Sequence, residues 1–271
     1  MLDITKYNGE NFLVCRDAFL GDVIISLCAI SSIKKKYPFK NFDFLTMPSY
    51  VKISSINKDI DSVISIDDAI ISMKDELDCL PNCINWSYGR IIDRFDYGGA
   101  VTLADSFMIE AKIKGAEVCA DDLRFEKMKK SNPIKKIGIS LCGSSIPKSM
   151  PKYVIDEIIG ELLEDYMVFS IGGCKSNIVH DNYVHVGFYD DCYELLEMIN
   201  DLDLLITADS GPMHLAYLAR TPFCVCFLTT SVVYALKHVI KSSINNYKIL
   251  EFDLNKHISS KKIISKSLSL L

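Results

Sequence analysis

An acid, a hydroxyl, a glycine and a histidine are concentrated between two apolar runs in the last third of the chain. In ITADSGPMHLA, Asp209 and Ser210 follow a strand-like run, Gly211 comes next, and His214 stands in the first turn of an expected helix. Ser and Asp favour helix N-caps, and glycine lets a ligand approach the backbone. The N–H groups and dipole at a helix N-terminus attract anions. The segment therefore predicts an anion site, although a well-capped helix with a surface histidine explains these residue types equally well.

A second polar loop, LCGSSIPKSMP at 141–151, follows another strand-like run. The hydroxyls of Ser144 and Ser145 are suited to bonding phosphate oxygens, and Lys148 brings a positive charge to them. Considered alone, a loop of this composition is also typical of an ordinary turn.

A third loop, FLGDV at 19–23, follows the first strand-like run. Gly21 permits a tight bend there, and the carboxylate of Asp22 is suited to taking a proton from an attacking hydroxyl. A positioned general base contributes roughly 10²–10⁴-fold to a reaction. The competing interpretation is that Asp22 merely caps the next helix, and composition alone favours that simpler role.

The three loops fit a rhythm of strand, loop and helix that is typical of parallel α/β proteins. Strands are expected at 11–15, 42–46, 61–67, 136–141, 166–173, 202–208 and 223–228, and helices at 23–37, 152–164, 192–200 and 212–219. In the middle of the chain, a strand is expected at 83–89 and a helix at 98–113.

A length of 271 residues suits two modest domains rather than one. The polar, basic segment at 126–136 surrounds a proline and is the candidate linker. We therefore expect an N-terminal domain at 1–130 and a C-terminal domain at 131–271, both doubly wound, with the ligand site in the cleft between them.

Composition excludes several classes of protein. A net charge of −5 argues against a general nucleic-acid binder, and no apolar run approaches the length of a membrane span. The first ten residues, MLDITKYNGE, lack the apolar core of a secretory signal. The ten cysteines form no C-x-x-C pair, so we expect reduced thiols that serve as small apolar residues. These features predict a cytoplasmic protein with at most peripheral membrane contact.

Together and in this order, the three loops resemble glycosyltransferase family 9, the ADP-heptose:lipopolysaccharide heptosyltransferases and their relatives. The resemblance covers most of the chain except its middle, and DSGPMHLA at 209–216 is its most specific string. It implies a GT-B fold, in which two Rossmann-like domains face a central cleft. It also implies an inverting transfer from a nucleotide-sugar that needs no metal ion, with the donor bound by the C-terminal domain and the acceptor by the N-terminal domain.

The resemblance also implies roles for individual residues. Asp22 matches the family's catalytic base, and Lys148 matches the lysine that neutralises the leaving diphosphate. The donor side comprises Lys148, Ser144, Ser145, Asp209, Ser210, Gly211, His214, Thr229 and Thr230. No cofactor is expected besides the donor, for which an ADP-sugar is the first choice. The expected acceptor is a glycan or lipid-linked glycan, such as lipopolysaccharide core.

Three donor-side positions depart from the family pattern. Met150 replaces a tryptophan, Thr229 and Thr230 stand where the family has Gly-Pro-Thr, and Asn177 lies near the place of a ribose-binding acid. They bear on which nucleotide-sugar is used rather than on the class of reaction. The string DLD at 201–203 matches a metal-binding D-x-D, but we interpret it as a helix end.

Acceptor-side candidates are Gly21, Trp86 and Arg90. Trp86 has an aromatic face for a sugar ring, and Arg90 suits an acceptor phosphate or carboxylate; simple packing is the other interpretation of Trp86. Two further functions stay open: a protein that binds a nucleotide-sugar without transferring it, and a sugar-nucleotide epimerase or hydrolase on the same fold.

Overall fold

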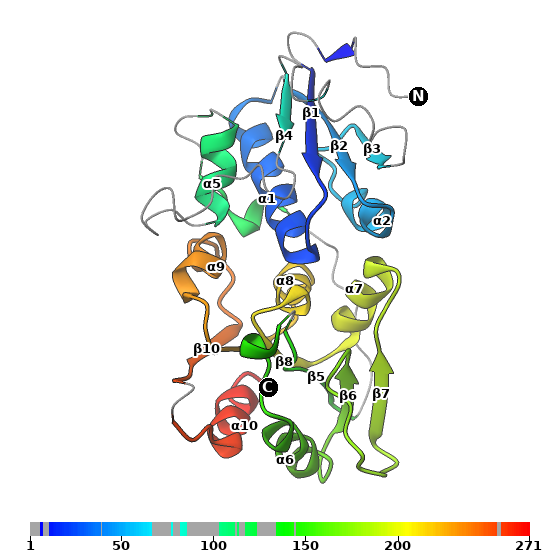
Figure 1. Ribbon diagram of the computed structural model, residues 1–271, viewed down its shortest axis with the longest axis vertical. Coiled ribbons are helices and arrows are strands. Elements are labelled where there is room, and N and C mark those ends of the chain that lie inside the picture. Colours follow the sequence, from blue (N-terminus) through cyan, green and yellow to red (C-terminus); the bar gives the residue numbers. More distant parts are fainter. Residues whose placement is uncertain are drawn as a thin grey trace. The chain divides into compact units, whose positions relative to one another are not determined.

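The computed structural model describes residues 6–7, 11–38, 40–66, 77, 82–85, 103–111, 113, 117–123, 134–143, 145–253 and 256–271. The chain forms two compact units, each built on one parallel sheet (Figure 1). Unit 1 comprises Met1–Arg124, Asp191–Tyr193 and Leu236–Ser243; unit 2 comprises Phe125–Asp190, Glu194–Ala235 and Ile244–Leu271. Most of the linker expected at 126–136 lies outside the described residues.

Unit 1 contains a four-stranded sheet in the order β3-β2-β1-β4, and every neighbouring pair is parallel. Its central strand β1 has the sequence NFLVCR, whose last four residues are buried. The described elements of this half are β1 (Asn11–Arg16), α1 (Leu20–Lys36), β2 (Asn41–Thr46), α2 (Val51–Ser54), β3 (Ser62–Ser65), β4 (Cys83–Asn85) and α5 (Leu103–Glu110), with short 3-10 turns at Pro48–Tyr50 and Ala120–Asp122.

Helix α1 is the main support of the unit 1 sheet, and α5 packs beside it (Figure 1). Its residues from Val23 to Ile33 are buried, which matches the mostly apolar sequence of this stretch. Lys34, Lys35 and Lys36 occupy the last turn, where cations interact favourably with the helix dipole. The helix therefore ends as its sequence predicts, next to Pro38.

Unit 2 contains a six-stranded parallel sheet in the order β10-β9-β8-β5-β6-β7. Counted along the chain within this unit, the order is 3-2-1-4-5-6, the arrangement of dinucleotide-binding α/β sheets. The elements are β5 (Lys136–Ser140), a 3-10 turn (Ile146–Lys148), α6 (Lys152–Leu162), β6 (Met167–Ile171), β7 (Tyr183–Gly187), α7 (Cys192–Asp201), β8 (Leu204–Ala208), α8 (Gly211–Leu218), β9 (Phe223–Phe227), α9 (Val232–Ile240), β10 (Tyr247–Glu251) and α10 (Ser260–Leu268).

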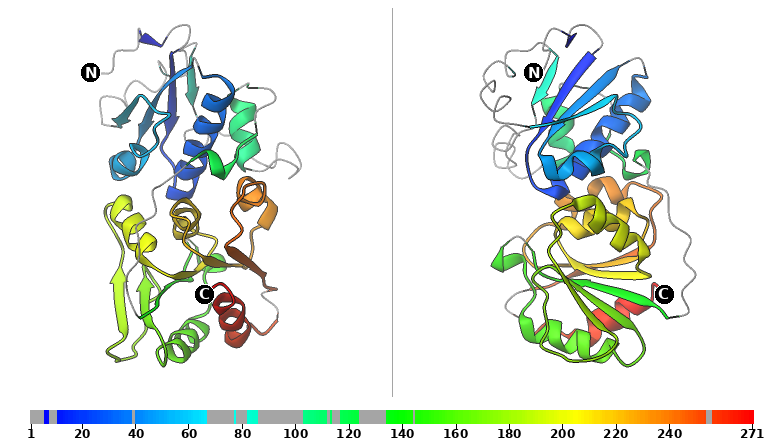
Figure 2. Two further views of the ribbon diagram at one scale, coloured as in Figure 1. Left: turned by 180° about the vertical axis from the view of Figure 1, so that it is seen from behind. Right: turned by 90° about the vertical axis from the view of Figure 1, so that its right-hand side faces the viewer.

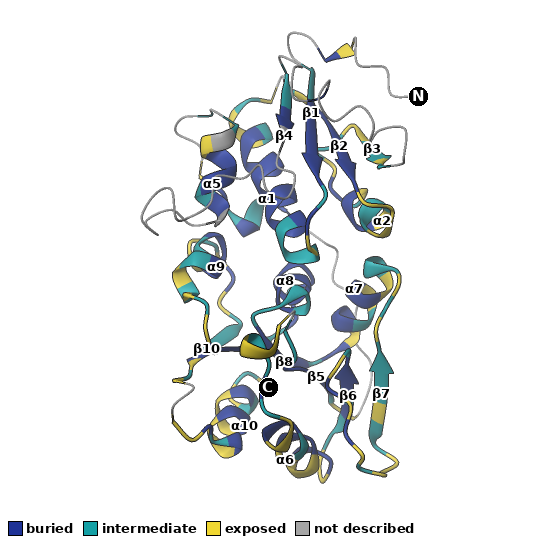
Figure 3. Cartoon of the chain, in the orientation of Figure 1, coloured by how far each residue is buried: buried dark blue, intermediate teal, exposed yellow. Residues whose placement is uncertain are grey.

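Helices cover both faces of the unit 2 sheet (Figure 2). Helices α6 and α10 pack side by side on one face, and α7 and α8 lie on the other. Strands β8 and β9 are buried along their whole length, whereas α6 and α10 turn polar residues outward (Figure 3). One continuous core joins these two helices to the sheet, and it includes Ile139, Ile158, Cys226 and Ile263.

The expected α/β class with parallel sheets is confirmed, and so are most of the expected elements. The sequence interpretation did not anticipate β7, α9, β10 or α10. The strand expected at 83–89 is described only as Cys83–Asn85, and the helix expected at 98–113 is described as Leu103–Glu110. The string DLD ends α7 at Asp201, as expected.

Candidate active site residues

The order of strands reverses at the same point in the two sheets, beside the first strand of each unit. In unit 1, β2 and β4 flank β1, and in unit 2, β6 and β8 flank β5. Doubly wound sheets bind their ligands outside the carboxyl ends of the strands at such a point. Asp22 follows β1, whereas Lys148 and Asp209 follow β5 and β8. These three residues therefore lie at the switch point of their own unit.

Lys148 and Asp209 form an ion pair across the switch point of unit 2. Nζ of Lys148 donates a hydrogen bond to Oδ2 of Asp209 at 2.8 Å, although the residues are 61 positions apart in the chain. The lysine side chain is 33% exposed and the aspartate side chain is 11% exposed. An ammonium group has three N–H donors, so one bond to Asp209 leaves donors for a phosphate.

Gly143 allows the loop after β5 to bring Lys148 into place. A Cβ atom at position 143 would lie 2.6 Å from Cβ of Lys148, so the two backbones approach too closely for any larger residue. The hydroxyl of Ser149 accepts a hydrogen bond from the Gly143 N–H at 3.1 Å and donates one to the carbonyl of Ser145 at 3.0 Å. The side chain of Ser145 is exposed, and Ser144 lies outside the described residues.

Met150 lies at the end of the same loop and packs into the interior of unit 2. Its side chain is buried in the unit 2 core, and its N–H donates to the carbonyl of Leu141 at 2.9 Å. The residue that replaces the expected tryptophan therefore has a packing role in this chain.

Helix α8 begins at Gly211, with Ser210 at the N-cap position and Pro212 in the first turn. The Ser210 hydroxyl makes no side-chain cap; it lies 3.4 Å from the carbonyl of Ala208 and 3.5 Å from the hydroxyl of Thr207. The expected capping hydrogen bond is therefore absent at Ser210. The positive end of the helix dipole is directed at the loop that carries Asp209.

His214 is buried rather than a surface residue, with 7% of its area exposed. Burial lowers the pKa of its imidazole to about 4; the charge of Asp209 opposes this shift and that of Lys148 adds to it. His214 is therefore neutral near pH 7, and its imidazole can act as a hydrogen-bond donor but not as a cation. Its Nδ1 lies 3.3 Å from the hydroxyl of Tyr217, and the two rings meet edge to face.

Thr229 and Thr230 line a pocket with a volume of about 400 Å³ at the carboxyl ends of β9 and β10. This pocket follows the strands next to β8 rather than the switch point itself. The residues around it are Phe227, Leu228, Thr229, Thr230, Ser231, Val232, Val233, Glu251 and Phe252.

Asp22 lies in the first turn of α1, which begins at Leu20 rather than at the expected position 23. Gly21 is consequently helical and does not form the expected tight bend. Phe19 occupies the N-cap position, so the simpler interpretation of Asp22 as the cap is wrong. An acid in the first turn is stabilised by the helix dipole. The Asp22 side chain is 21% exposed.

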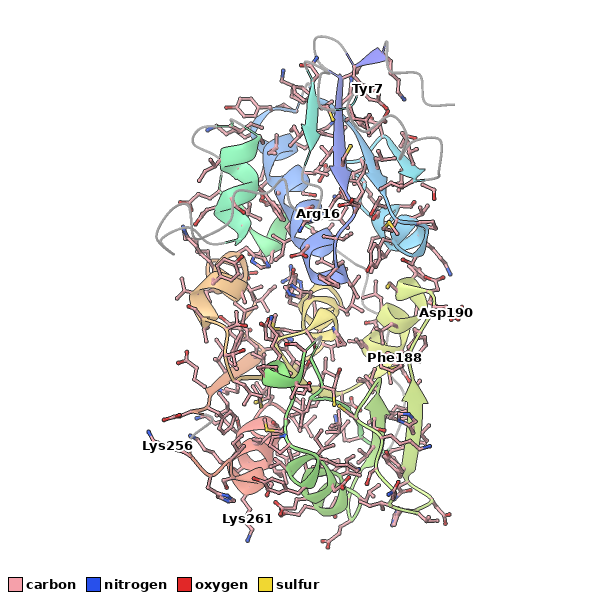
Figure 4. All side chains as sticks on the ribbon, in the orientation of Figure 1. Tyr7, Arg16, Phe188, Asp190, Lys256 and Lys261 are labelled. Carbon is pink, nitrogen blue, oxygen red and sulfur yellow. The ribbon has the colours of Figure 1, made fainter. Side chains whose placement is uncertain are left out.

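Arg16, the last residue of β1 and labelled in Figure 4, contacts the Asp22 carboxylate, which Figure 4 does not label. Its Nη2 lies 3.2 Å from Oδ2 of Asp22, and its Cζ lies 5.3 Å from the ring centroid of Phe107. The arginine is only 3% exposed. A buried cation at this distance favours the ionised form of a carboxylate.

Some residues predicted from the sequence lie outside the part of the chain that the structure describes. Two other residues beside the site were not predicted from the sequence. Trp86 and Arg90 belong to the first group, together with Ser144. The missed residues are Arg16 and Tyr217. A charge at the end of an apolar strand was the available signal for Arg16, and a spacing of three residues from His214 on one helix was the signal for Tyr217.

No three His, Cys, Asp or Glu side chains in the part of the chain that the structure describes are grouped as a metal site requires. No described helix has the length and apolar character needed to cross a membrane.

The fold is similar to those of solved glycosyltransferases. The structure of glycosyl transferase family 9 from Veillonella parvula DSM 2008 matches with a TM-score of 0.72 at 14% identity, over 100% of this chain and 98% of that chain. E. coli ADP-heptose LPS heptosyltransferase II gives a TM-score of 0.71 at 14% identity, over 96% of this chain and 98% of that chain. E. coli heptosyltransferase WaaC with ADP gives 0.64 at 11% identity, over 96% of this chain and 100% of that chain.

No protein-family model matches this chain, and no curated protein matches it. The structural likenesses nevertheless extend over nearly the whole chain, including the segments that carry the three loops. What they establish is the fold: the chain has the GT-B fold of the family 9 glycosyltransferases, with one parallel α/β sheet in each unit.

Proposed function

We propose that this chain is an inverting glycosyltransferase that moves a sugar from a nucleotide-sugar to a hydroxyl of a glycan acceptor without a metal ion. The observation that carries the proposal is the Lys148–Asp209 ion pair at the switch point of unit 2, directly before the N-terminus of α8. A cation and a helix N-terminus at the ligand-binding edge of a doubly wound sheet suit a diphosphate.

The unit 2 residues have the chemistry required by a leaving nucleoside diphosphate. When the bond between the anomeric carbon and the phosphate oxygen breaks, negative charge grows on the diphosphate. Lys148, the first amides of α8 and the neutral His214 supply positioned donors for that charge. In this role Asp209 positions the Lys148 ammonium, and the hydroxyls of Ser144, Ser145 and Ser210 add further hydrogen bonds.

Asp22 is the proposed base. The acceptor hydroxyl attacks the anomeric carbon on the face opposite the diphosphate, its proton passes to the Asp22 carboxylate, and the configuration at that carbon is inverted. Arg16 contributes by holding Asp22 ionised and oriented. A positioned base is worth roughly 10²–10⁴-fold in rate.

Two solved neighbours favour an ADP-sugar as the donor. The WaaC structures contain ADP in one case and ADP-2-deoxy-2-fluoro heptose in the other. We therefore propose ADP-heptose as the first donor to test, with a lipopolysaccharide-type glycan as the acceptor. We also propose a cytoplasmic site of action with at most peripheral membrane contact.

The test begins with thermal unfolding of the pure protein in the presence of ADP, UDP, GDP, CMP and their sugar conjugates. A ligand at 100 times its dissociation constant adds about 2.7 kcal/mol to the stability. Stabilisation by ADP compounds alone supports the ADP-sugar donor, whereas stabilisation by UDP or GDP compounds moves the proposal to another donor. The absence of any shift would contradict nucleotide binding at Lys148 and Asp209.

Product analysis with and without a glycan acceptor then tests transfer. Asp22→Asn should abolish transfer and change donor affinity by no more than a few-fold, because Asp22 lies in unit 1 and the donor residues lie in unit 2. Unchanged transfer by this variant would remove Asp22 from the mechanism. Nucleotide-sugar binding without transfer to any acceptor would favour a binding protein, and release of free sugar would favour a hydrolase.

A further inference from the structure

The pocket at the carboxyl ends of β9 and β10 has the size of a small-ligand site. Its volume of about 400 Å³ falls within the roughly 300–1,000 Å³ of such sites. The loop from Leu228 to Ser231 forms one side, and Glu251 and Phe252 form another. Every lining residue belongs to unit 2, so the pocket is complete within that unit.

The pocket lies beside the proposed diphosphate site. Ala208, which precedes Asp209, is paired with Cys226 on β9, and Phe227 is paired with Glu251 on β10. Neighbouring strands are about 4.8 Å apart. The loop after β9 therefore lies about one strand spacing from the loop that carries Asp209, a distance that suits two groups joined by a single bond.

The lining of the pocket suits an uncharged polyol rather than a phosphate. Thr229, Thr230 and Ser231 supply hydroxyls, Glu251 supplies a carboxylate, and no lining residue carries a positive charge. A carboxylate repels phosphate but accepts hydrogen bonds from sugar hydroxyls, and such charge-assisted bonds are among the stronger ones. The ring of Phe252 adds apolar surface for the C–H face of a sugar.

The opposite side of the switch point is better suited to the nucleoside. In sheets of this order, a ligand lies across the carboxyl ends of the strands on both sides of the switch point, so its two ends reach opposite halves of the sheet. Gly172 follows β6 with a φ of +64°, and the ring of Phe188 lies 3.3 Å from where a Cβ of Gly172 would stand. Phe188 follows β7 and is 87% exposed, so its ring is available for stacking on a base (Figure 4).

We propose that the pocket at β9 and β10 binds the sugar of the donor, and that Glu251 and Thr230 select it through its hydroxyls. This proposal rests on the proposed function, because the sugar that it places in the pocket belongs to the same nucleotide-sugar donor. The base then lies at β6 and β7, the diphosphate at β5 and β8, and the sugar at β9 and β10. Glu251 is thereby a specificity-determining residue rather than a phosphate ligand.

The experiment compares two probes, ADP and ADP-heptose, by calorimetry on the full chain. Glu251→Ala should weaken ADP-heptose binding about tenfold and leave ADP binding within twofold, because ADP has no sugar in the pocket. Thr230→Val should act in the same direction with a smaller effect. Asp253→Asn is the matched control, since this exposed acid lies two residues beyond Glu251, is absent from the pocket lining and pairs with Lys256.

Phe188→Ala should instead weaken the binding of ADP and of ADP-heptose equally, because both probes contain the base. Equal effects of Glu251→Ala on the two probes, or no effect on either, would overturn the sugar pocket while nucleotide binding stands. If the unaltered protein binds neither probe, the ADP-sugar donor itself is wrong and the assignment of the pocket falls with it. Unchanged melting temperatures of the variants confirm that they are folded.

Discussion

Nη2 of Arg16 lies 3.2 Å from Oδ2 of Asp22, and the arginine is nearly buried while the aspartate is partly exposed. This relationship links the end of β1 to the first turn of α1. It places a positive charge beside the proposed base, whose side chain is 21% exposed. Tyr50 is a second neighbour: burial is the main cause of the raised pKa of that phenol, and the charge of Asp22 adds to it.

Replacement of Arg16 by Gln should lower the transfer rate and leave the affinity for ADP nearly unchanged. The Asp22 carboxylate loses the buried guanidinium that holds it, whereas the residues proposed to bind the nucleotide lie in unit 2. A positioned base is worth roughly 10²–10⁴-fold, so we expect a loss of about tenfold when its position is disturbed. Transfer assays and calorimetric titration with ADP test this, with Lys35→Gln, at the exposed lysine of the Lys35–Asp122 pair, as the control. An unchanged transfer rate would contradict the positioning role of Arg16.

Replacement of Lys148 by Gln should weaken binding of a nucleoside diphosphate by about 10- to 100-fold. A hydrogen bond to a charged group contributes about 1.5–3 kcal/mol, and Gln has no charge to offer. Lys152→Gln is a suitable control because Lys152 lies nearby in sequence but pairs with Asp156 on the exposed side of α6. Calorimetric titration with ADP measures both variants, and equal affinities would exclude Lys148 from the site.

His214 should make the protein less stable as the pH falls from 6.5 to 4. In the unfolded chain the imidazole has its ordinary pKa of 6.5, whereas burial lowers the folded-state pKa to about 4. Protons therefore bind preferentially to the unfolded state in this window, and stability that is complete above pH 6.5 is lost progressively below it. A shift of this size corresponds to about 3 kcal/mol.

Urea unfolding at pH 7, 6 and 5 measures this effect. His214→Gln lacks the titrating group, so its stability should decline less over the same range. His180→Gln, at an exposed histidine, should behave as the unaltered chain does. Equal slopes for all three proteins would show that His214 does not carry the pH dependence.

Cys142 should react with iodoacetamide faster than Cys192 at pH 7.5. A hydrogen bond from Cys174 lowers the pKa of the Cys142 thiol to about 7, whereas burial raises that of Cys192 to about 11. The thiolate is the reactive form, so the difference in pKa decides the order. Peptide mass spectrometry identifies the labelled sites. Because Cys142 precedes Gly143 in the proposed phosphate loop, ADP should slow its labelling; preferential labelling of Cys192 would contradict the assignment.

Local sequence signals were sufficient for the strands and loops that carry the proposed donor site. The buried strands β5, β8 and β9 have continuous apolar runs, and Ser210, Gly211 and Pro212 mark the start of α8. Strand β7 was missed because it is only partly buried and carries a histidine in its middle, so it has no such run. The start of α1 was missed because Gly21 and Asp22 favour a loop by composition, whereas packing of the helix against the sheet overrides that preference.

Contacts between distant segments had no sequence signal at all. Nothing local to Lys148 indicates that Asp209 is its partner, since the pairing depends on β5 and β8 becoming neighbours. The pocket at Thr229 and Glu251 likewise requires β9 and β10 to be adjacent in the sheet. The residue types of the proposed site were therefore predictable from the sequence. Which of these residues contact one another was not predictable, because that depends on the order of the strands in the sheet.

The spacing of 61 residues between Lys148 and Asp209 also sets an order of events on the ribosome. At about 5–20 residues per second, the loop that carries Lys148 is synthesised roughly 3–12 s before its acidic partner. Strands β5 and β6 are available to pair in that interval, but β8 is not. A nascent chain that stalls before β8 thus exposes one unprotected edge of β5 and leaves Lys148 without its acidic partner.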